Sequence, residues 1–205
     1  MSTPGAATKR LVDVVASAVG LVLTGPIQAA IAAAVKADSP GPAIFKQERV
    51  GKDGRRFEIL KFRTMSRGAV GAAITPTGDH RVTKVGAMLR RTKLDELPQL
   101  WNVLVGDMSL VGPRPEVPHY VDLWPDDHRD KILSMRPGIT DPASIEYRDE
   151  GALLAAQPDP ERFYREVILP HKTAIYSAYV DSASPSLDLE ILLRTVRALR
   201  SPRAL

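Results

Sequence analysis

The stretch that decides the architecture runs from Leu11 to Val35 and reads LVDVVASAVGLVLTGPIQAAIAAAV. Its only charged side chain is Asp13, and its only amide side chain is Gln28. A helix needs about 20 predominantly apolar residues to cross the hydrocarbon core of a bilayer. The stretch is therefore long enough to be a membrane helix.

Basic residues flank this stretch on both sides. Lys9 and Arg10 precede it, and Lys36 opens a basic region after it. Because Lys and Arg mark the cytoplasmic side of a membrane helix, both ends are expected on the cytoplasmic side. Gly25 and Pro26 lie near the middle, and proline removes a helical hydrogen bond and clashes with the preceding turn. A kink or break is expected there.

A helix broken at this point would enter and leave the same face of the membrane. At 1.5 Å per residue the arms 11–24 and 26–35 would reach about 20 Å and 15 Å, or one leaflet each. Ser17, Thr24 and Gln28 are polar side chains that can satisfy backbone groups near the break. We therefore predict a re-entrant membrane helix.

Two other interpretations of the stretch stay open. A signal peptide would explain Lys9 and Arg10, but the apolar run exceeds the usual length of about 7–15 residues and carries Asp13 at its start. A buried, alanine-rich helix of a soluble protein is the other alternative. Under the re-entrant interpretation, residues 1–38 form the tail and membrane helix, and residues 39–205 form a domain on the cytoplasmic face.

The composition excludes several classes of protein. The chain has 205 residues, of which 44% are hydrophobic and 25% are charged, as in a folded protein. The absence of cysteine excludes disulfide-stapled modules, thiolate zinc sites, iron–sulfur clusters and cysteine nucleophiles. The sequence has no P-loop, G-x-G-x-x-G or G-x-S-x-G signature, and its four histidines lack metal-ligand spacing.

Charge is distributed unevenly along the chain. Residues 36–93 contain 14 Lys or Arg and 5 Asp or Glu, whereas residues 94–205 contain 12 and 18. A basic region of this density suits a polyanion, which means nucleic acid, the anionic cytoplasmic leaflet or a phosphate-rich small molecule. Composition does not choose among them.

The pattern after residue 40 predicts an α+β fold that is mostly helical. The run AIFKQERV-GKDG-RRFEILKFR is typical of a β-hairpin with its turn at Asp53 and Gly54. A short helix is expected over residues 83–91, and amphipathic helices at the membrane interface over 161–171 and 187–199. The apolar stripe of the last helix, either buried or membrane-facing, is Leu189, Leu192, Leu193 and Val196.

An acidic pair, Asp95 and Glu96, stands in the segment TKLDELPQLWNVL. Pro98 fits only the first turn of a helix, so the helix is expected to start near Asp95. Capping alone would explain two acids at a helix N-terminus. The stripe expected to pack inward has helical spacing and consists of Leu97, Leu100, Trp101 and Leu104.

Cations around the acidic pair indicate a second role. Arg90, Arg91 and Lys93 precede the pair, and Arg114 follows in a rigid loop between two prolines. Carboxylates among cations suit a magnesium–phosphate site, because Mg²⁺ takes one or two carboxylates plus substrate oxygens while arginine binds the remaining phosphate charge. A carboxylate can also attack phosphorus and form an acyl phosphate.

Several long motifs in register resemble the bacterial sugar transferases, the small monotopic phosphoglycosyl transferases. They are the KR pair before the proline-broken helix, SPGPAIFKQERVGKDGRRFEILKFRTM, LRRTKLDELPQLWNVLVGDMSLVGPRPEVP and RPGIT, which together cover Lys9 to Thr140. The resemblance implies an enzyme on the cytoplasmic face of the bacterial inner membrane. It would transfer a sugar-1-phosphate from a UDP-sugar to a polyprenyl (undecaprenyl) phosphate, release UMP and require Mg²⁺, as the first membrane step of glycoconjugate or exopolysaccharide synthesis.

The resemblance also implies roles for the site residues. Asp95 resembles the nucleophile of the family, which takes up the phosphosugar as an aspartyl phosphate and helps to hold the metal. Glu96 would be its partner, as a base, a metal ligand or an orienting group. Arg90 and Arg114 resemble the phosphate and nucleotide clamps.

Two further sets of residues follow from the same motifs. Lys61 and Arg63 would support the clamps, with a solvated strand face or a lipid headgroup contact as alternatives. Lys9 and Arg10 would anchor at lipid headgroups, and Pro26 with its neighbour Gly25 would make the re-entrant break.

The chain departs from the family pattern after RPGIT. Many relatives continue with G-x-A-Q-x-x-G-R, whereas residues 141–148 read DPASIEYR, so the transferred sugar stays open. No multi-span region precedes Lys9, and we expect the minimal catalytic form, for which a homodimer is allowed. A non-catalytic scaffold on anionic membrane and a nucleic-acid binder are the alternatives, but 11 Phe, Trp or Tyr residues leave few stacking platforms, so no nucleic-acid partner is expected.

Overall fold

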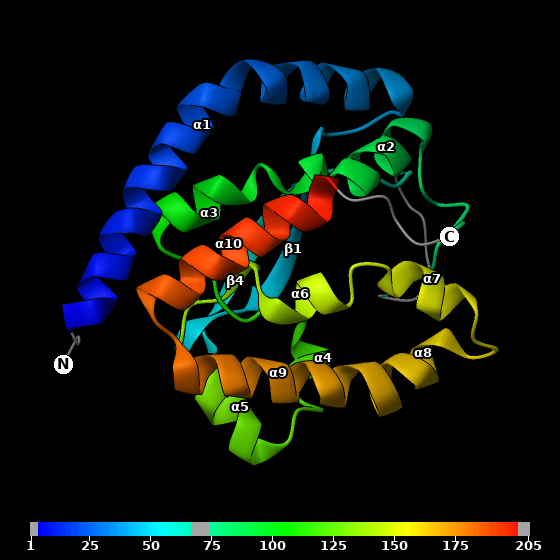
Figure 1. Cartoon of the computed structure of the whole chain (residues 1–205). Helices are drawn as coiled ribbons and strands as arrows, with labels where there is room; N and C mark the ends of the chain where they lie inside the picture. The colour runs from blue at the N-terminus through cyan, green and yellow to red at the C-terminus, as the bar shows by residue number, and fades with distance from the viewer. Residues whose placement is uncertain (1–3, 67–73, 201–205) are drawn as a thin grey trace.

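The computed structural model describes residues 4–66 and 74–200 and shows an α+β fold that is mostly helical. The first element, helix α1 (Pro4–Asp38), contains Pro26 and bends near its middle (Figure 1). The expected kink is therefore a bend within one continuous helix. Thr24 Oγ1 donates a hydrogen bond to Gly20 O (2.6 Å), and Gln28 Nε2 donates to Thr24 Oγ1 (2.9 Å). These side chains supply polar contacts next to the proline.

Most of α1 is exposed. It is the one helix in the described ranges that is long and apolar enough to cross a membrane. An 18-residue window of this helix has a mean hydropathy of 1.9, and only 11% of the residues in that window are buried. A core helix of a soluble protein would be mostly buried, so that alternative is wrong. The first arm of the helix nevertheless docks on the rest of the chain through Ser17, which is fully buried, and Asp13, whose Oδ1 accepts a hydrogen bond from Leu110 N at 2.9 Å.

The predicted hairpin is confirmed. Strands β1 (Ile44–Val50) and β2 (Arg56–Phe62) pair antiparallel, with Ile44 opposite Phe62. A short 3₁₀ turn, η1 (Lys52–Gly54), joins them, and Asp53 and Gly54 adopt φ values of 56° and 74°. These are left-handed conformations that Asp and Gly tolerate at a tight turn.

After the hairpin, the short helix expected over residues 83–91 is present, but the next helix begins later than expected. Helix α2 (Lys84–Thr92) begins after Thr83, whose side chain caps it. Asp95 and Glu96 then lie in a separate 3₁₀ turn, η2 (Leu94–Glu96), and helix α3 (Gln99–Val105) starts only after Pro98. The prediction that one helix begins near Asp95 was wrong.

The predicted inward stripe around α3 was right for Leu97, which packs against a core cluster, and for Leu100, which packs against α1, but wrong for Trp101. Trp101 is 52% exposed, whereas Gln99, Asn102 and Val103 are buried. The reason is tertiary: Asn102 Oδ1 accepts from Leu60 N (3.0 Å) and its Nδ2 donates to Glu58 O (2.8 Å), which satisfies backbone groups of β2. The hydrogen bonds that Asn102 makes to the backbone of β2 therefore set the orientation of the helix more strongly than burial of Trp101 does.

The remaining chain builds a helical layer around a short parallel pair. Strands β3 (Ser109–Val111) and β4 (Gly138–Thr140) form that pair. The other elements are α4 (Pro118–Val121), α5 (Asp126–Leu133), α6 (Pro142–Glu146), α7 (Glu150–Ala155), α8 (Pro160–Phe163), the π-turn η3 (Tyr164–Ile168), α9 (Leu169–Ser182) and α10 (Pro185–Arg200). The largest core cluster includes Tyr120, Trp124, Tyr164 and Tyr176.

The two C-terminal helices extend the sequence predictions. The helix expected at 161–171 is real but continues to Ser182 through η3 and α9. Helix α10 lies over β3, β4 and α6 (Figure 1). Its Ile191 is fully buried, whereas the predicted stripe is exposed at Leu189, Leu193 and Val196.

Gly86 makes a close approach that we expect to control stability. A Cβ at this position would lie 2.1 Å from Thr64 O, so Gly86→Ala must separate α2 from the segment after β2. We expect a loss of about 1–3 kcal/mol of unfolding free energy, as for other overpacked sites. Thermal unfolding of the purified protein in detergent checks this. Gly5→Ala is the control, because no atom lies within 4 Å of its Cβ position, and an equal change in both variants would contradict the prediction.

Candidate active site

The acidic pair occupies a sharp turn between two helices. Lys93 ends α2 in a left-handed conformation (φ 58°), which is uncommon for a residue with a Cβ and turns the chain directly into η2. Asp95 and Glu96 are both only 8% exposed. Two adjacent buried carboxylates repel each other, so nearby cations must compensate them.

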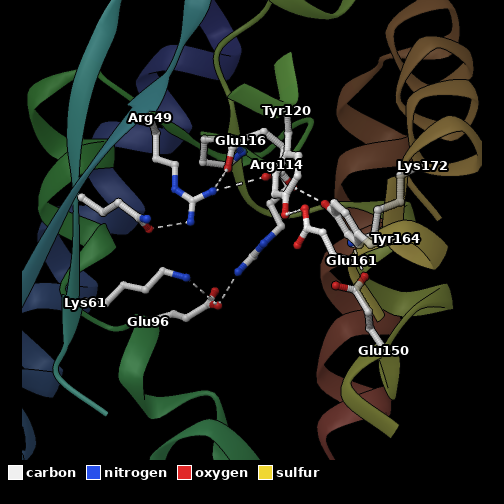
Figure 2. Close-up of polar contacts among 12 residues, drawn as sticks. Arg49, Lys61, Glu96, Arg114, Glu116, Tyr120, Glu150, Glu161, Tyr164 and Lys172 are labelled. Carbon is white, nitrogen blue, oxygen red and sulfur yellow. Dashed lines mark hydrogen bonds and ion pairs between the residues drawn. The ribbon is translucent and has the colours of Figure 1, made fainter. Parts of the chain in front are cut away.

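Glu96 is held by two cations. Its Oε1 accepts from Arg114 Nη2 at 2.8 Å and from Lys61 Nζ at 3.4 Å, as Figure 2 shows. Burial alone would raise the pKa of Glu96, but the charges of Arg114 and Lys61 keep that pKa well below its usual range. Burial in turn lowers the pKa of Lys61 to about 8, although Glu96 opposes the shift. Glu96 therefore stays ionised and fixes both cations.

Asp95 has a different environment. Its Oδ1 is buried and has no hydrogen-bond partner within residues 4–66 and 74–200. Burial, and then the negative charge of Glu96, raise the pKa of Asp95. A buried carboxylate oxygen without a donor is rare and fits a ligand atom for a cation or a substrate group. Within the described ranges no group of three or more Asp, Glu or His side chains is placed to hold a metal ion, so a metal at Asp95 would depend on substrate oxygens as well.

The loop that carries Arg114 is stiff, as its prolines predict. Pro113 O accepts from Gly138 N (2.9 Å), and Pro115 O accepts from Arg49 Nη1 (3.3 Å). The backbone on both sides of Arg114 is thus tied to β4 and to β1. The Arg114 guanidinium is consequently carried by a backbone whose position is fixed.

The sequence analysis did not predict a network of polar contacts that lies next to Arg114. Arg49 Nη1 lies 3.3 Å from Glu116 Oε2, and Tyr164 OH donates to Glu116 Oε1 at 3.0 Å (Figure 2). Glu116 directly follows the second of the two prolines that bracket Arg114, and this position was a signal that the sequence analysis could have used. Arg49 gave no such signal, because it looks like any other basic residue of the hairpin.

The structure brings Arg90 close to the acidic pair but uses Arg63 elsewhere. Arg90 Nε donates to Thr64 Oγ1 at 2.9 Å, and its charge acts on Asp95. Arg63 donates to Val35 O, Ser39 O (2.7 Å) and Pro40 O (2.5 Å) at the end of α1. These contacts hold the membrane helix to β2, and a role of Arg63 in substrate binding stays a prediction.

The basic pair before the apolar stretch makes contacts inside the protein. Lys9 Nζ donates to Val111 O at 2.9 Å and forms an ion pair with Asp188 of α10. Arg10 donates to Val103 O (2.6 Å) and Leu104 O (2.9 Å), two carbonyls in the last turn of α3, where helical carbonyls lack a full set of partners within the helix. These contacts lock the first arm of α1 in place, and headgroup anchoring stays a prediction.

A cavity of about 310 Å³ opens beside Glu96 and Arg114. Its walls come from α2, η2 and α3, from the segment between β4 and α9, and from the last turns of α10. The lining contains two acids, Glu96 and Glu150, and five cations: Arg91, Lys93, Arg114, Arg148 and Lys172. The formal excess of three positive charges suits a polyphosphate ligand.

Known proteins resemble this chain over most of its length. The family model described as "Bacterial sugar transferase" matches residues 5–201. A UDP-N-acetylgalactosamine-undecaprenyl-phosphate N-acetylgalactosaminephosphotransferase of Aeromonas hydrophila is 38% identical over 93% of this chain and 43% of its own length. A UDP-glucose:undecaprenyl-phosphate glucose-1-phosphate transferase of Caulobacter vibrioides is 39% identical over 93% of this chain and 69% of its own length. The chain thus spans less than half of the first protein and about two thirds of the second.

Proposed function

The chain belongs to the bacterial sugar transferase family, and from that premise we propose that it transfers a sugar-1-phosphate from a UDP-sugar to a polyprenyl phosphate and releases UMP. The observation that carries the proposal is the contrast within the acidic pair. Glu96 Oε1 accepts hydrogen bonds from both Arg114 and Lys61, whereas Asp95 Oδ1 is buried without a donor. One carboxylate is arranged to hold cations, and the other is left free to react.

Asp95 is the nucleophile in this proposal. In the first step an Asp95 oxygen bonds to the β-phosphorus of the UDP-sugar, the bond from that phosphorus to the bridging oxygen breaks, and UMP leaves with the electron pair. In the second step an oxygen of the polyprenyl phosphate attacks the same phosphorus. The bond to Asp95 then breaks, which restores the carboxylate and yields the polyprenyl diphosphate sugar.

The neighbouring cations stabilise the charge that moves between the phosphates. Arg114 and Lys61 are positioned by Glu96, and Arg90 lies close enough to Asp95 for its charge to act there. Charged donors fixed in a partly dry site favour the transition state because they need no reorganisation. Glu96 is accordingly a positioning residue for two of the three cations.

Magnesium fits the same site. Asp95, with its unpartnered Oδ1, is the side chain that would hold the ion. When bound, Mg²⁺ would neutralise phosphate charge as a Lewis acid.

The decisive experiment is magnesium-dependent UMP release from a panel of UDP-sugars with undecaprenyl phosphate. We expect one UDP-sugar to support turnover, which would also identify the sugar. A scaffold on anionic lipid would bind membranes equally well with Asp95 replaced. A nucleic-acid binder would show salt-dependent oligonucleotide binding and no UMP release.

We also propose that α1 is re-entrant and that the enzyme lies on the cytoplasmic face of the inner membrane. Single cysteines at the exposed positions Ala6 and Lys46 are expected to resist a membrane-impermeant thiol reagent in intact cells and to react after permeabilisation. Pro26→Leu should favour a straight span, because the apolar run is long enough for one, and should expose the Ala6 cysteine outside. Labelling of the Ala6 cysteine in intact cells without Pro26→Leu would contradict the topology.

A further inference from the structure

We propose that the apolar wall of the 310 Å³ cavity receives the first isoprene units of the polyprenyl phosphate acceptor. This wall consists of Leu97 in the turn between η2 and α3, Leu100 in the first turn of α3, and Ala198 and Leu199 at the end of α10. The inference rests on the proposed function, because it assigns the acceptor of that reaction to one side of the site.

The cavity has two chemically different sides. Ser144, Arg148, Glu150 and Lys172 gather on the side of α6, α7 and α9, where Lys172 forms an ion pair with Glu150. The apolar wall is formed by other elements, the segment at Leu97 and Leu100 and the end of α10, and Ile139 and Ile145 add apolar lining from β4 and α6. A nucleotide sugar is polar along its whole length and is matched by the first side, whereas a polyprenyl phosphate joins one charged group to a hydrocarbon chain and needs both kinds of surface.

The apolar wall is continuous with the apolar exterior. Leu100 packs against α1 at Gly20, where a Cβ would lie 3.1 Å from Leu100 Cδ1. Leu199 lines the cavity and is 49% exposed, so it continues the exposed stripe of α10. The apolar wall therefore adjoins both α1 and the exposed apolar stripe of α10, which are the surfaces that a hydrocarbon chain would contact outside the cavity.

The charged end of such a ligand also has a place. Arg91 and Lys93 line the cavity on the α2 side and form no ion pair with any residue of the described ranges. They stand two to four residues before Asp95 in the sequence. A phosphate held there would have its hydrocarbon along Leu97 and Leu100 and its oxygens toward the acidic pair.

A matched pair of α10 variants tests the assignment. Leu199 and Leu193 are both 49% exposed, but of the two only Leu199 lines the cavity. In detergent micelles, we expect Leu199→Gln to raise the KM for undecaprenyl phosphate about tenfold, as the loss of an apolar contact in a pocket does. Leu193→Gln removes the same group from the same helix and should leave this KM unchanged.

Two further readouts separate the possible failures. UMP release in a single turnover without acceptor reports the donor step, and Leu199→Gln should retain it. An equal acceptor KM in both variants, or a loss confined to the donor step, would overturn the inference. Absence of UMP release from the wild-type protein with every UDP-sugar would instead overturn the proposed function.

Photo-cross-linking tests the wall independently of turnover. A polyprenyl phosphate with a diazirine in its first isoprene unit, added without UDP-sugar, should label the peptides that carry Leu97 and Leu100 or Ala198 and Leu199. Ala198→Phe, which fills the wall, should reduce this labelling severalfold. Labelling confined to α1 and unchanged by Ala198→Phe would overturn the inference.

Discussion

Asp95→Asn is expected to reduce turnover by at least about a thousandfold, because an amide cannot form the acyl phosphate and is a poorer magnesium ligand. The effect should be this large because Asp95 supplies the only reacting group of the proposed first step. Glu96 is not expected to replace it, because Glu96 Oε1 already accepts hydrogen bonds from Arg114 and Lys61 and is held beside them. The direct measurement uses a UDP-sugar labelled in the β-phosphate, without acceptor, and should trap label on the peptide that contains Asp95.

Asp122→Asn is the matched control for this experiment. Asp122 is an exposed carboxylate after α4, so its loss changes the charge equally without touching the site. Label in the Asp95→Asn protein, or sequential kinetics with no trapped label in the wild type, would contradict the covalent role. The reaction class would still stand in that case.

Arg114→Lys is expected to lower kcat/KM at limiting UDP-sugar by about a hundredfold, the effect of one or two lost charge-assisted hydrogen bonds. Lysine keeps the charge but loses the planar set of donors. The loop around Arg114 is fixed at Pro113 O and Pro115 O, so the backbone cannot move to compensate. The 2.8 Å contact with Glu96 would also be lost or lengthened.

Arg56→Lys provides the comparison for a cation in the general positive field. The Arg56 side chain is 64% exposed and pairs with Glu48 at the hairpin surface, where an ion pair contributes little. This variant should be nearly silent. Near-wild-type activity of Arg114→Lys with unchanged membrane binding would show that Arg114, like Arg56, contributes only to the general positive charge of the surface.

Local chemistry determined the parts of the structure that the sequence predicted well. The length and apolarity of α1 and the bend near Pro26 follow from residues adjacent in the chain, as does the hairpin turn at Asp53 and Gly54. The stiffness of the Arg114 loop follows from its two prolines. The acidic pair could be singled out because the cations around it are close in sequence.

Tertiary contacts decided which charged side chains belong to the site. Arg49 and Arg56 look equivalent in the basic hairpin, yet Arg49 is paired with Glu116, 67 residues away, and Arg56 is at the surface. Lys61 and Arg63 lie two positions apart on the same motif, but one reaches Glu96 and the other closes the end of α1.

The sequence by itself therefore determined the long apolar helix and the hairpin and singled out the acidic pair, because periodicity, turn chemistry and proline geometry act over a few residues. It could not determine the orientation of α3, the partners of Lys9 and Arg10 or the residues that line the cavity. Those depend on which buried backbone groups and charges must be satisfied once distant segments pack together. Asn102 turned inward and Trp101 outward for that reason, because two β2 backbone groups, Glu58 O and Leu60 N, required hydrogen-bond partners that only the folded chain could supply.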